Sequence, residues 1–320
     1  MIRIGRRAAL GAALLAAPAR AQAWPTRPVR LLVPFPPGGP ADVLARLLAG
    51  PLAESWGQPV IVENRAGAGG NIGAEAVARA APDGHTLLLN ASSHVQGAAL
   101  YSKLAFDPVR DFSPITQIAY YSLVLVVHPS VPVTDLAGFE ALLRARPGEV
   151  TITSAGVGTP THLTAELFRI RAGVEFTHVP FGGAAPAHAA LLGGQVMAMF
   201  HNPVMSVPAV QAGRLRALAT TGAVRAAALP DVPTLAESGY PGFESGTWYL
   251  VVGPAGMPAP VVARIDADLR RAIALPAVRE KLAAQSMEPR DLGPDPLAAL
   301  MREELARWTE VIQRLGIRQD

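Results

Sequence analysis

Four glycine-rich turns, two in each half of the chain, contain the residues that could hold a ligand. Each turn follows a short apolar run typical of a β-strand and precedes a stretch typical of a helix. The turns are residues 36–42, 64–71, 154–160 and 180–186. Such a unit directs unpaired backbone N–H groups and the positive end of a helix dipole toward one point, which favours an anion. Facing pairs of these turns could hold both ends of a small anion in a cleft.

Single residues of these turns allow two interpretations. A glycine either adopts a positive φ in a tight turn or lets the backbone approach a ligand closely. Phe35 and Phe181 either wall the ligand site or fill the core, and Asp42 either caps a helix or meets a ligand amine, with capping favoured. For the four turns together, a shared use in binding is the better interpretation. The glycines concerned include Gly38, Gly39, Gly69 and Gly158.

A secreted serine hydrolase that acts on a small ester is the alternative from another class. Ser154 or Ser92 would be the nucleophile, and a histidine would be the general base. Neither serine lies in a G-x-S-x-G motif, and no carboxylate is placed to orient the imidazole of His162. A place in the first turn of a helix is therefore the favoured interpretation of His162. Ser92 and Ser93 stand beside His94 at the end of a predicted strand, where His94 either faces the ligand or is structural.

No cofactor or metal ion is expected. Residues 67–69 look like part of a dinucleotide-binding turn, but the third glycine falls at position 73 instead of 72. The next predicted strand ends at Asn90 and offers no acid for a ribose, and the chain has no P-loop motif. The seven histidines form no H-x-x-x-H or H-E-x-x-H pair, and the chain contains no cysteine.

The first 23 residues predict a signal peptide for export to the periplasm. Arginines precede an apolar run at 8–17, and the small-residue sequence Ala21-Gln22-Ala23 follows as a cleavage site. About ten apolar residues are too few to span a bilayer, which needs roughly 20. Because Arg6 and Arg7 are adjacent, the twin-arginine route is open beside the Sec route.

Removal of this segment changes the charge of the protein. The segment holds four of the 28 basic side chains and none of the 25 acidic ones, so the mature chain has a net charge near −1. With no basic run, the mature chain has no electrostatic footprint for nucleic acid. No later segment has 18 uninterrupted apolar residues, which predicts a soluble mature protein.

Predicted strands and helices alternate from residue 29 to about residue 210, which favours α/β layers with largely parallel strands. Strands are predicted at 29–35, 60–63, 86–89, 122–127, 150–153, 176–179 and 247–252. Helices are predicted at 40–54, 72–81, 134–146, 160–172, 185–194, 207–213 and 296–315. The apolar strands 122–127 and 247–252 are candidates for two crossings between domains. The first domain would then contain residues 24–121 plus 248–320, and the second would contain residues 122–247.

Several stretches, in order along nearly the whole chain after residue 23, carry a family resemblance. They are residues 33–42, 63–71, 82–88, 106–112, 158–163, 178–181 and 229–244. In these stretches the sequence resembles the substrate receptors of tripartite tricarboxylate transporters, the TctC or Bug family of periplasmic binding proteins. The resemblance implies an α/β, two-domain periplasmic-binding-protein fold, type II-like, whose two crossing strands let it close on a ligand like a flytrap.

The resemblance also implies a function and a site. It implies a receptor, not an enzyme, that captures a small organic carboxylate and delivers it to a tripartite tricarboxylate-type permease or a sensor. The first-domain loops and the loop at 158–159 would recognise the carboxylate, partly through ordered waters, and we expect a monomer. The substrate-binding residues carried over are Phe35, Gly38, Gly39, Ala68, Gly69, Ser154, Gly158 and Thr159. Ser92, Ser93, His162, Phe181, His201 and Asn202 complete the candidates.

Two departures from the family pattern concern the second domain. Members often have a tyrosine and a basic residue where this chain has Phe181-Gly182, and often an acid where it has His201 before Asn202. The second-domain side of the site is therefore expected to be less charged and roomier. Between mono- and dicarboxylates, this favours a monocarboxylate or an aromatic acid as ligand.

Overall fold

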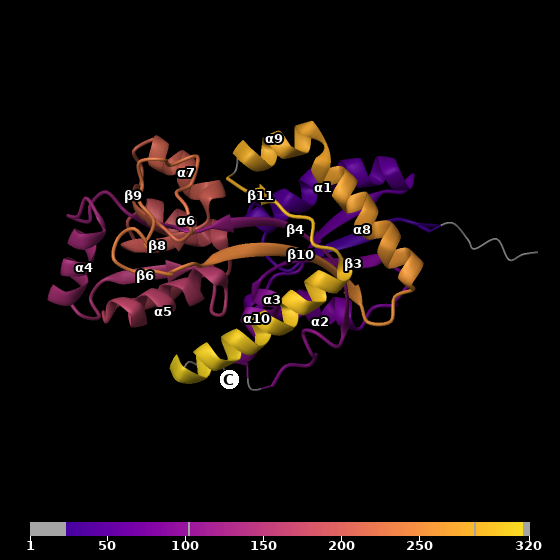
Figure 1. Ribbon diagram of the computed structural model, residues 1–320, viewed down its shortest axis with the longest axis horizontal. Coiled ribbons are helices and arrows are strands. Elements are labelled where there is room, and N and C mark those ends of the chain that lie inside the picture. Colours follow the sequence, from indigo (N-terminus) through magenta and orange to yellow (C-terminus); the bar gives the residue numbers. More distant parts are fainter. Residues whose placement is uncertain (1–23, 102, 285, 316–320) are drawn as a thin grey trace, which may run out of the picture.

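The computed structural model describes residues 24–101, 103–284 and 286–315. It shows an elongated molecule with two lobes side by side, each built around one β-sheet (Figure 1). The predicted signal peptide at residues 1–23 lies outside the described residues. No helix of the described part is both long and apolar enough to cross a membrane.

The first lobe contains a six-stranded sheet in the order β11-β4-β10-β3-β1-β2. Its strands are β1 (Val29–Val33), β2 (Val60–Asn64), β3 (Thr86–Ala91), β4 (Phe112–Ser122), β10 (Gly246–Pro254) and β11 (Glu288–Pro289). Its helices are α1 (Pro40–Trp56), η1 (Ala68–Gly70), α2 (Asn71–Ala78), α3 (Ser93–Gln96), η2 (Ala98–Leu100), α8 (Ala259–Ala274), α9 (Pro276–Ala284) and α10 (Pro294–Leu315).

The second lobe contains a five-stranded sheet in the order β7-β6-β8-β5-β9. Its strands are β5 (Val124–Val127), β6 (Thr151–Ser154), β7 (Thr177–Pro180), β8 (Ala198–His201) and β9 (Arg216–Thr220). Its helices are α4 (Leu136–Ala145), α5 (Pro160–Ala172), α6 (Ala184–Leu192) and α7 (Pro203–Gln211).

Helices cover both faces of the first sheet because its strands are apolar on both sides. In β1, Leu31 and Val33 belong to the core formed with α1 and α8, whereas Leu32 packs with α2 and α10 on the other face. This alternation follows from the two-residue period of a strand. All three side chains are buried, and each contributes roughly 1.5–3 kcal/mol of transfer free energy.

The chain passes between the two sheets twice. β4 ends in the first sheet at Ser122 and β5 begins in the second at Val124, while the return leads into β10 at Gly246. Thr221 joins the two passages, since its Oγ1 accepts the N–H of Leu123 at 2.8 Å and donates to the carbonyl of Ser245. The strands are thus divided between the sheets as the predicted crossings require, and the domain boundaries at 121/122 and 247/248 stay a prediction.

The expectation of largely parallel strands is wrong, because both sheets are mixed. β1 pairs with β2 and β3 in parallel, and β6 pairs in parallel with β7 and β8. β10 runs antiparallel to β3 and β4, and β5 runs antiparallel to β8 and β9. The strands that carry the chain between the sheets enter from the opposite end and therefore reverse the local direction.

Several elements differ from the expected ranges. β8 and β9 match no predicted strand, and the predicted strand 122–127 is divided between the end of β4 and β5. Residues 112–121 of β4 were not predicted as strand, because Ser113, Pro114 and Gln117 interrupt the apolar pattern. α7 begins at Pro203 instead of residue 207, with Asn202 as its N-cap.

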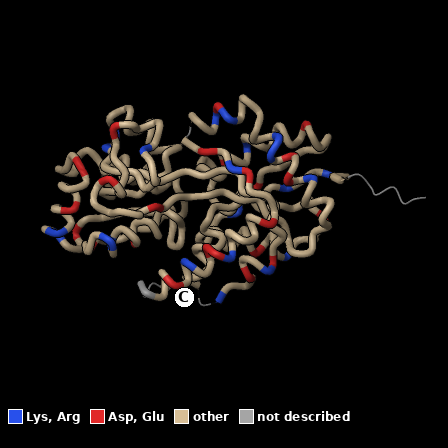
Figure 2. The backbone as a smooth tube through the Cα atoms, viewed as in Figure 1, with Lys and Arg blue, Asp and Glu red and all other residues tan. Residues whose placement is uncertain are grey.

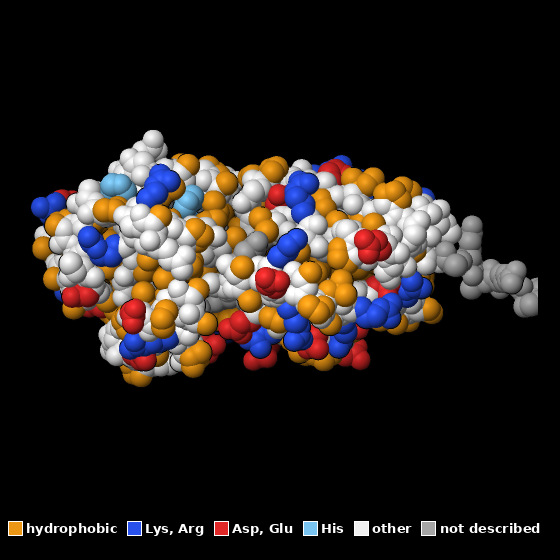
Figure 3. Space-filling view, turned by 90° about the horizontal axis from the view of Figure 1, so that it is seen from above, with side chains coloured by type: hydrophobic (Ala, Val, Ile, Leu, Met, Phe, Trp, Pro, Cys, Tyr) orange, Lys and Arg blue, Asp and Glu red, His pale blue; other side chains and the backbone are white. Residues whose placement is uncertain are grey.

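Charged side chains are distributed over both lobes without a field of one sign. Acidic and basic positions are interspersed along the backbone (Figure 2). The face seen from above likewise mixes acidic and basic side chains (Figure 3).

Candidate functional site

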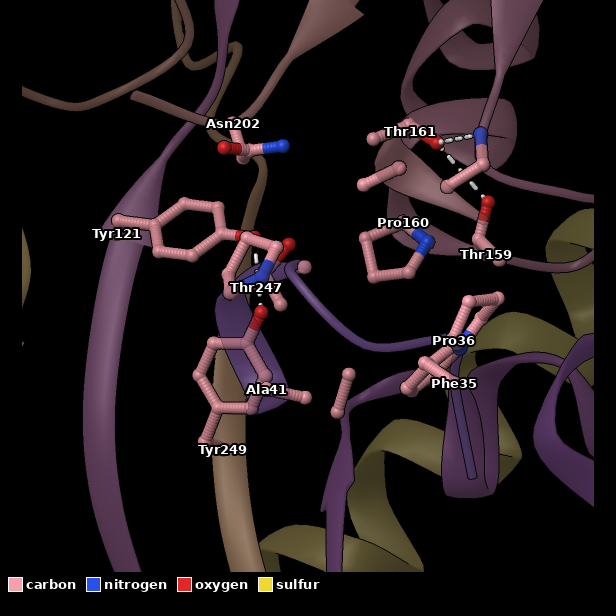
Figure 4. Close-up of a pocket in the computed structure, with 15 residues that line it drawn as sticks. Phe35, Pro36, Ala41, Tyr121, Thr159, Pro160, Thr161, Asn202, Thr247 and Tyr249 are labelled. Atoms are coloured by element: carbon pink, nitrogen blue, oxygen red, sulfur yellow. Dashed lines mark hydrogen bonds between the residues drawn. The ribbon is translucent and has the colours of Figure 1, made fainter. Parts of the chain in front are cut away.

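A cavity of about 50 Å³ lies between the two sheets and is lined by residues of both. The first sheet and its helices contribute Phe35, Pro36, Gly39, Pro40, Ala41, Ala91, Tyr121, Thr247 and Tyr249. The second contributes Ala155, Thr159, Pro160, Thr161, Ala184 and Asn202. Figure 4 shows Tyr121 and Tyr249 on one side of the cavity and Thr159–Thr161 on the other. Among the described residues that line it, none is Lys, Arg, His, Asp or Glu.

Four helices begin at this cavity, one from the first domain and three from the second. α1 begins at Pro40, α5 at Pro160 and α6 at Ala184, and Asn202 is the N-cap of α7. Each start follows the carboxyl end of a strand, where α/β proteins place their ligands. The helix N-termini add positive partial charge on several sides of the cavity.

Unpaired backbone donors accompany these helix starts. The N–H groups of Ala41, Thr161 and Ala184 have no hydrogen-bond partner within the described part of the chain. Their lack of an intrahelical partner follows from their position in the first turn. Since all three residues line the cavity, their N–H groups are available to an acceptor bound there.

The first-domain turn is held from behind by Asp42, whose carboxylate does not line the cavity. It accepts hydrogen bonds from the N–H of Gly38 at 3.0 Å, from Arg46 and from Nδ2 of Asn64. Although burial acts to raise it, the pKa of Asp42 is lowered by these bonds, with Arg46 contributing most. Asn64 also donates to the carbonyl of Phe35, so the loop is tied to β2 as well as to α1.

The second-domain turn is held by two threonines at the start of α5. Thr159 Oγ1 donates to the carbonyl of Gly156 at 2.6 Å, so its proton is occupied. Thr161 Oγ1 lies 2.9 Å from Thr159 Oγ1 and therefore donates to it, while accepting the N–H of Ala155 at 3.0 Å. Both hydroxyl protons are thus used within the loop, and its backbone N–H groups remain as the donors for a ligand.

Two histidines lie beneath this turn. His162 Nδ1 accepts the N–H of Gly158 at 3.2 Å, and its ring stacks on His178 with centroids 4.1 Å apart. Burial, with smaller contributions from His178 and Arg169, lowers the pKa of His162 to about 3, and burial lowers that of His178 to about 4. The two imidazoles are therefore neutral at ordinary pH, as a packed core requires.

The crossing strands supply the hydroxyl groups of the cavity. Tyr121 on β4 and Tyr249 on β10 have their Oη atoms 3.0 Å apart, and Thr247 lies beside them. Burial raises the pKa of Tyr121 to about 12, so its hydroxyl stays protonated and can donate.

Of the predicted site residues, the structure brings Phe35, Gly39, Thr159 and Asn202 together around the cavity. Gly38 is one residue away with its N–H bonded to Asp42. His201 lies directly behind Asn202, and Ser154 and His162 lie beneath the turn before α5.

The remaining predicted residues lie elsewhere. Gly69 and Gly158 stand where the two domains meet: a Cβ on Gly69 would lie 2.9 Å from the carbonyl oxygen of Val157, and Ala68 precedes Gly69 in η1. Ser92 and Ser93 are buried at the start of α3, after the cavity residue Ala91.

The structure also shows where Phe35, Phe181 and His94 lie. Phe35 lines the cavity and also packs on the core of the first domain. Phe181 packs on hydrophobic side chains of the second domain and does not line the cavity. His94 is structural: its Nε2 is 2.9 Å from the carbonyl of Pro108 and its ring packs against Phe112.

Cavity residues on the crossing strands and at three helix starts were not among the predicted site residues. They are Tyr121, Thr247 and Tyr249 on the strands, and Pro40, Ala41, Pro160, Thr161 and Ala184 at the helix starts. The signal that could have found the tyrosines is alternation: if the apolar residues of a crossing strand face the core, its polar neighbours face the cleft.

A serine and a histidine do form a pair, but away from the cavity. Ser154 Oγ lies 2.8 Å from His178 Nε2, while Ser154 is fully buried and does not line the cavity. Ser92 Oγ has no partner among the described residues. No group of three or more His, Asp or Glu side chains in the described part could hold a metal ion.

Comparison with known sequences relates almost the whole chain to one group of proteins. The family described as "Tripartite tricarboxylate transporter family receptor" matches residues 44–317. Protein BugT of Bordetella pertussis is 39% identical over 304 residues, which cover 94% of this chain and 93% of BugT.

Solved structures agree with this relation. The periplasmic binding protein BugD superposes with a TM-score of 0.88 at 32% identity, covering 93% of this chain and 100% of that chain. Rpa4515 of R. palustris, solved with adipate, gives a TM-score of 0.88 at 37% identity and covers 92% of this chain and 99% of its own. MatC of Rhodopseudomonas palustris, solved with bound malate, gives a TM-score of 0.86 at 37% identity and covers 90% of this chain and 100% of its own.

Proposed function

Because the chain belongs to the tripartite tricarboxylate transporter receptor family, we propose that it is a periplasmic receptor that binds a small organic carboxylate between its domains. The observation that carries the proposal is the meeting of four helix starts at one cavity, with unpaired N–H groups at Ala41, Thr161 and Ala184. Backbone donors and helix dipoles of this kind stabilise an anion without a basic side chain. They come from both domains, so a ligand bound there would favour the closed form.

The size and lining of the cavity narrow the ligand class. The cavity volume of about 50 Å³ is far below the roughly 300–1,000 Å³ of sites for drug-sized ligands, which supports a small ligand over a large one. The related structures hold adipate and malate, which are small carboxylates. Apolar walls from Phe35, Pro36 and Ala91 suit the hydrocarbon part of such an acid. The ligand is therefore a mono- or dicarboxylate, with an aromatic acid within the class.

Backbone donors can supply enough free energy to bind a carboxylate without lysine or arginine. A dissociation constant of 1 μM corresponds to about 8 kcal/mol. A hydrogen bond to a charged group contributes roughly 1.5–3 kcal/mol, so three or four backbone donors supply much of this free energy.

Membership of the family supports a role in uptake or sensing. After export, the receptor captures its acid in the periplasm as a monomer and delivers it to the membrane permease of a tripartite tricarboxylate transporter or to a sensor. It does so by hinge closure about the two crossings near Leu123 and Ser245, and it leaves the acid chemically unchanged.

A thermal-shift screen of mono-, di-, tricarboxylic and aromatic acids tests the proposal, with calorimetry on the hits. Stabilisation by at least one acid, with micromolar or tighter affinity, is the expected result. Indifference of the protein to every acid of the panel would refute the proposal.

The hydrolase alternative is favoured by one observation, the 2.8 Å contact between Ser154 and His178. The expectation that no carboxylate lies near the imidazole of His162 is wrong, since Oε1 of Glu166 is 3.9 Å from its Nε2. Among the described residues no carboxylate contacts His178, and Ser154 is fully buried, which favours a structural role for the Ser154–His178 contact. If purified protein turned over a small ester and Ser154→Ala abolished that turnover while still folding, the hydrolase would replace the receptor.

A further inference from the structure

Asn202 presents its amide nitrogen to the cavity in a fixed orientation. Its Oδ1 accepts the N–H of Met205 at 3.0 Å, and a backbone N–H can be matched only by the oxygen of the amide. Nδ2 then lies on the other side, 3.2 Å from Nδ1 of His201, with a second hydrogen left over. In Figure 4 the nitrogen of Asn202 points across the cavity toward the side of Thr161. Asn202 is therefore a hydrogen-bond donor toward a ligand.

Asn202, His201 and His188 form a chain of hydrogen bonds in which the protons can be assigned in only one way. The backbone N–H of Asn202 donates to His201 Nδ1 at 2.9 Å, so this nitrogen carries no proton. The proton of His201 must then be on Nε2, which lies 2.7 Å from Nδ1 of His188 and donates to it. His188 in turn keeps its own proton on Nε2.

Burial disfavours a charge on both rings. His201 is fully buried, and burial together with the neighbouring His188 lowers its pKa to about 3. Burial also lowers the pKa of His188, and the charge of Arg214 adds to the effect. β5, on the other side of His201, places the apolar Val124 opposite it.

We propose that the His188–His201 pair is a positioning device that holds Asn202 as a donor, so that the receptor selects acids with an oxygen acceptor at this point and rejects their amino counterparts. The proposal rests on the proposed function. An ammonium group there would face an N–H donor, and no described carboxylate lines the cavity to pair with it. Burying a charge without a partner costs free energy, so the site should bind the acid more tightly than the compound with an ammonium group.

The first test uses the unliganded protein and needs no knowledge of the ligand. Long-range ¹H–¹⁵N spectra of the histidine rings should show His201 as the neutral Nε2–H form between pH 7 and pH 5. His188→Ala removes the acceptor of that proton and should change the shifts of His201, whereas His128→Ala, a half-buried histidine at the end of β5, should not. An Nδ1–H form of His201, or its protonation near pH 6, would overturn the proposal.

The second test uses calorimetry to compare acids that carry a hydroxyl oxygen with the counterparts that carry an amino group in its place: lactate with alanine, malate with aspartate, and 2-hydroxyadipate with 2-aminoadipate. The pair that contains the best-bound acid should show at least a tenfold preference for the acid. Asn202→Asp should abolish or reverse that preference. His188→Ala should weaken acid binding about fivefold to tenfold, His188→Asn should restore it because its Oδ1 can accept the His201 proton, and His128→Ala should bind normally.

The outcomes separate the inference from the proposed function. Equal affinity for an acid and its amino counterpart would overturn the positioning role and leave a carboxylate receptor. Loss of affinity in His188→Ala that His188→Asn does not restore would show a merely structural histidine and would also overturn it. If no acid or amino acid bound, the proposed function itself would fail, and the inference would fail with it.

Discussion

Gly97 and Gly158 are in direct backbone contact across the boundary between the two domains. Gly97 follows α3 in the first domain, and Gly158 precedes α5 in the second. A Cβ on Gly158 would lie 3.2 Å from Cα of Gly97, and a Cβ on Gly97 would lie 3.0 Å from the carbonyl oxygen of Gly158. The domains thus approach until the two main chains touch, which leaves no room for a side chain at either position.

Gly97→Ala should weaken ligand binding about tenfold while the protein stays folded. The φ of Gly97 is −75°, which alanine readily adopts, but the added methyl group would lie 2.9 Å from the carbonyl oxygen of Ser93 and 3.0 Å from that of Gly158. It therefore strains the end of α3 slightly and opposes the closed form through Gly158. A matched control is Gly50→Ala on α1, where a Cβ would meet nothing within 4 Å. Calorimetry with the best acid of the screen measures both variants. Equal affinities of the two variants would argue against a closed form with this contact.

Gly158→Val should abolish binding with a modest loss of stability. Gly158 has a φ of +78°, and its Cβ would lie 2.8 Å from Cδ1 of Leu100. Gly173→Val provides the control, because Gly173 has a φ of +59° in open space and carries backbone strain alone. Retained affinity in Gly158→Val, measured beside its melting temperature, would contradict the role of this turn.

The sequence predicted the turns of the cleft better than the use of each glycine. Gly39, predicted from its turn, and Thr159, carried over from the family resemblance, both line the cavity. Gly158 lies in the same predicted turn as Thr159, yet a neighbouring backbone requires its glycine. A tight turn, a closely bound ligand and contact with a second domain can each exclude a Cβ. A glycine before a helix start can therefore be required for any of these three reasons, and the sequence does not distinguish them.

The crossing strands show why the rest of the site could not be predicted. Strand 247–252 was predicted from its apolar run, but which of its side chains face the cleft depends on its pairing with β3 and β4. That register places Thr247 and Tyr249 beside Tyr121 from a distant part of the sequence. No sequence motif or residue spacing predicts that these three side chains lie together.

Thr161→Val should weaken acid binding about tenfold, although its hydroxyl proton is not directed at the ligand. The change leaves the N–H of Ala155, which is half-buried, without its acceptor; a fully buried donor left unmatched costs about 1–3 kcal/mol, and this one costs less. The turn that holds the N–H groups would then lose its fixed geometry. Thr177→Val is the control, since Thr177 bonds the carbonyl of Gly148 in an exposed position of the same domain. A binding constant unchanged in Thr161→Val would show that the threonine pair does not shape the site.

Stability should fall as the pH is lowered from about 6.5 to about 4. His94, with a pKa near 4, and His201, with a pKa near 3, are neutral in the folded protein because burial disfavours their charge. In the unfolded chain these histidines take up a proton near pH 6.5. The unfolded state therefore binds more protons than the folded state throughout this window, and lowering the pH stabilises the unfolded state relative to the folded one. Each buried histidine contributes a slope of about 1.4 kcal/mol per pH unit. Urea unfolding at pH 7, 5.5 and 4.5 measures the slope, and constant stability over this range would contradict the buried neutral assignment.

Asp42→Ala should reduce acid affinity at least fivefold from a position outside the cavity. The carboxylate of Asp42 anchors Gly38 and links Arg46 with Asn64, so its removal frees the turn that carries Gly39 and the start of α1. One lost backbone bond and one lost ion pair make a cost of about 1–3 kcal/mol reasonable, divided between folding and binding.

Asp266→Ala on α8 is the control for this change, because Asp266 forms the same i,i+4 pair with Arg270 and does not line the cavity. Its removal should leave the binding constant unchanged and lower stability only slightly. Calorimetry and urea unfolding on both variants separate the two effects. If Asp42→Ala lost stability but bound the acid as tightly as the unmodified protein, the turn would not need its anchor, and the first-domain donors would have to be held by Asn64 alone.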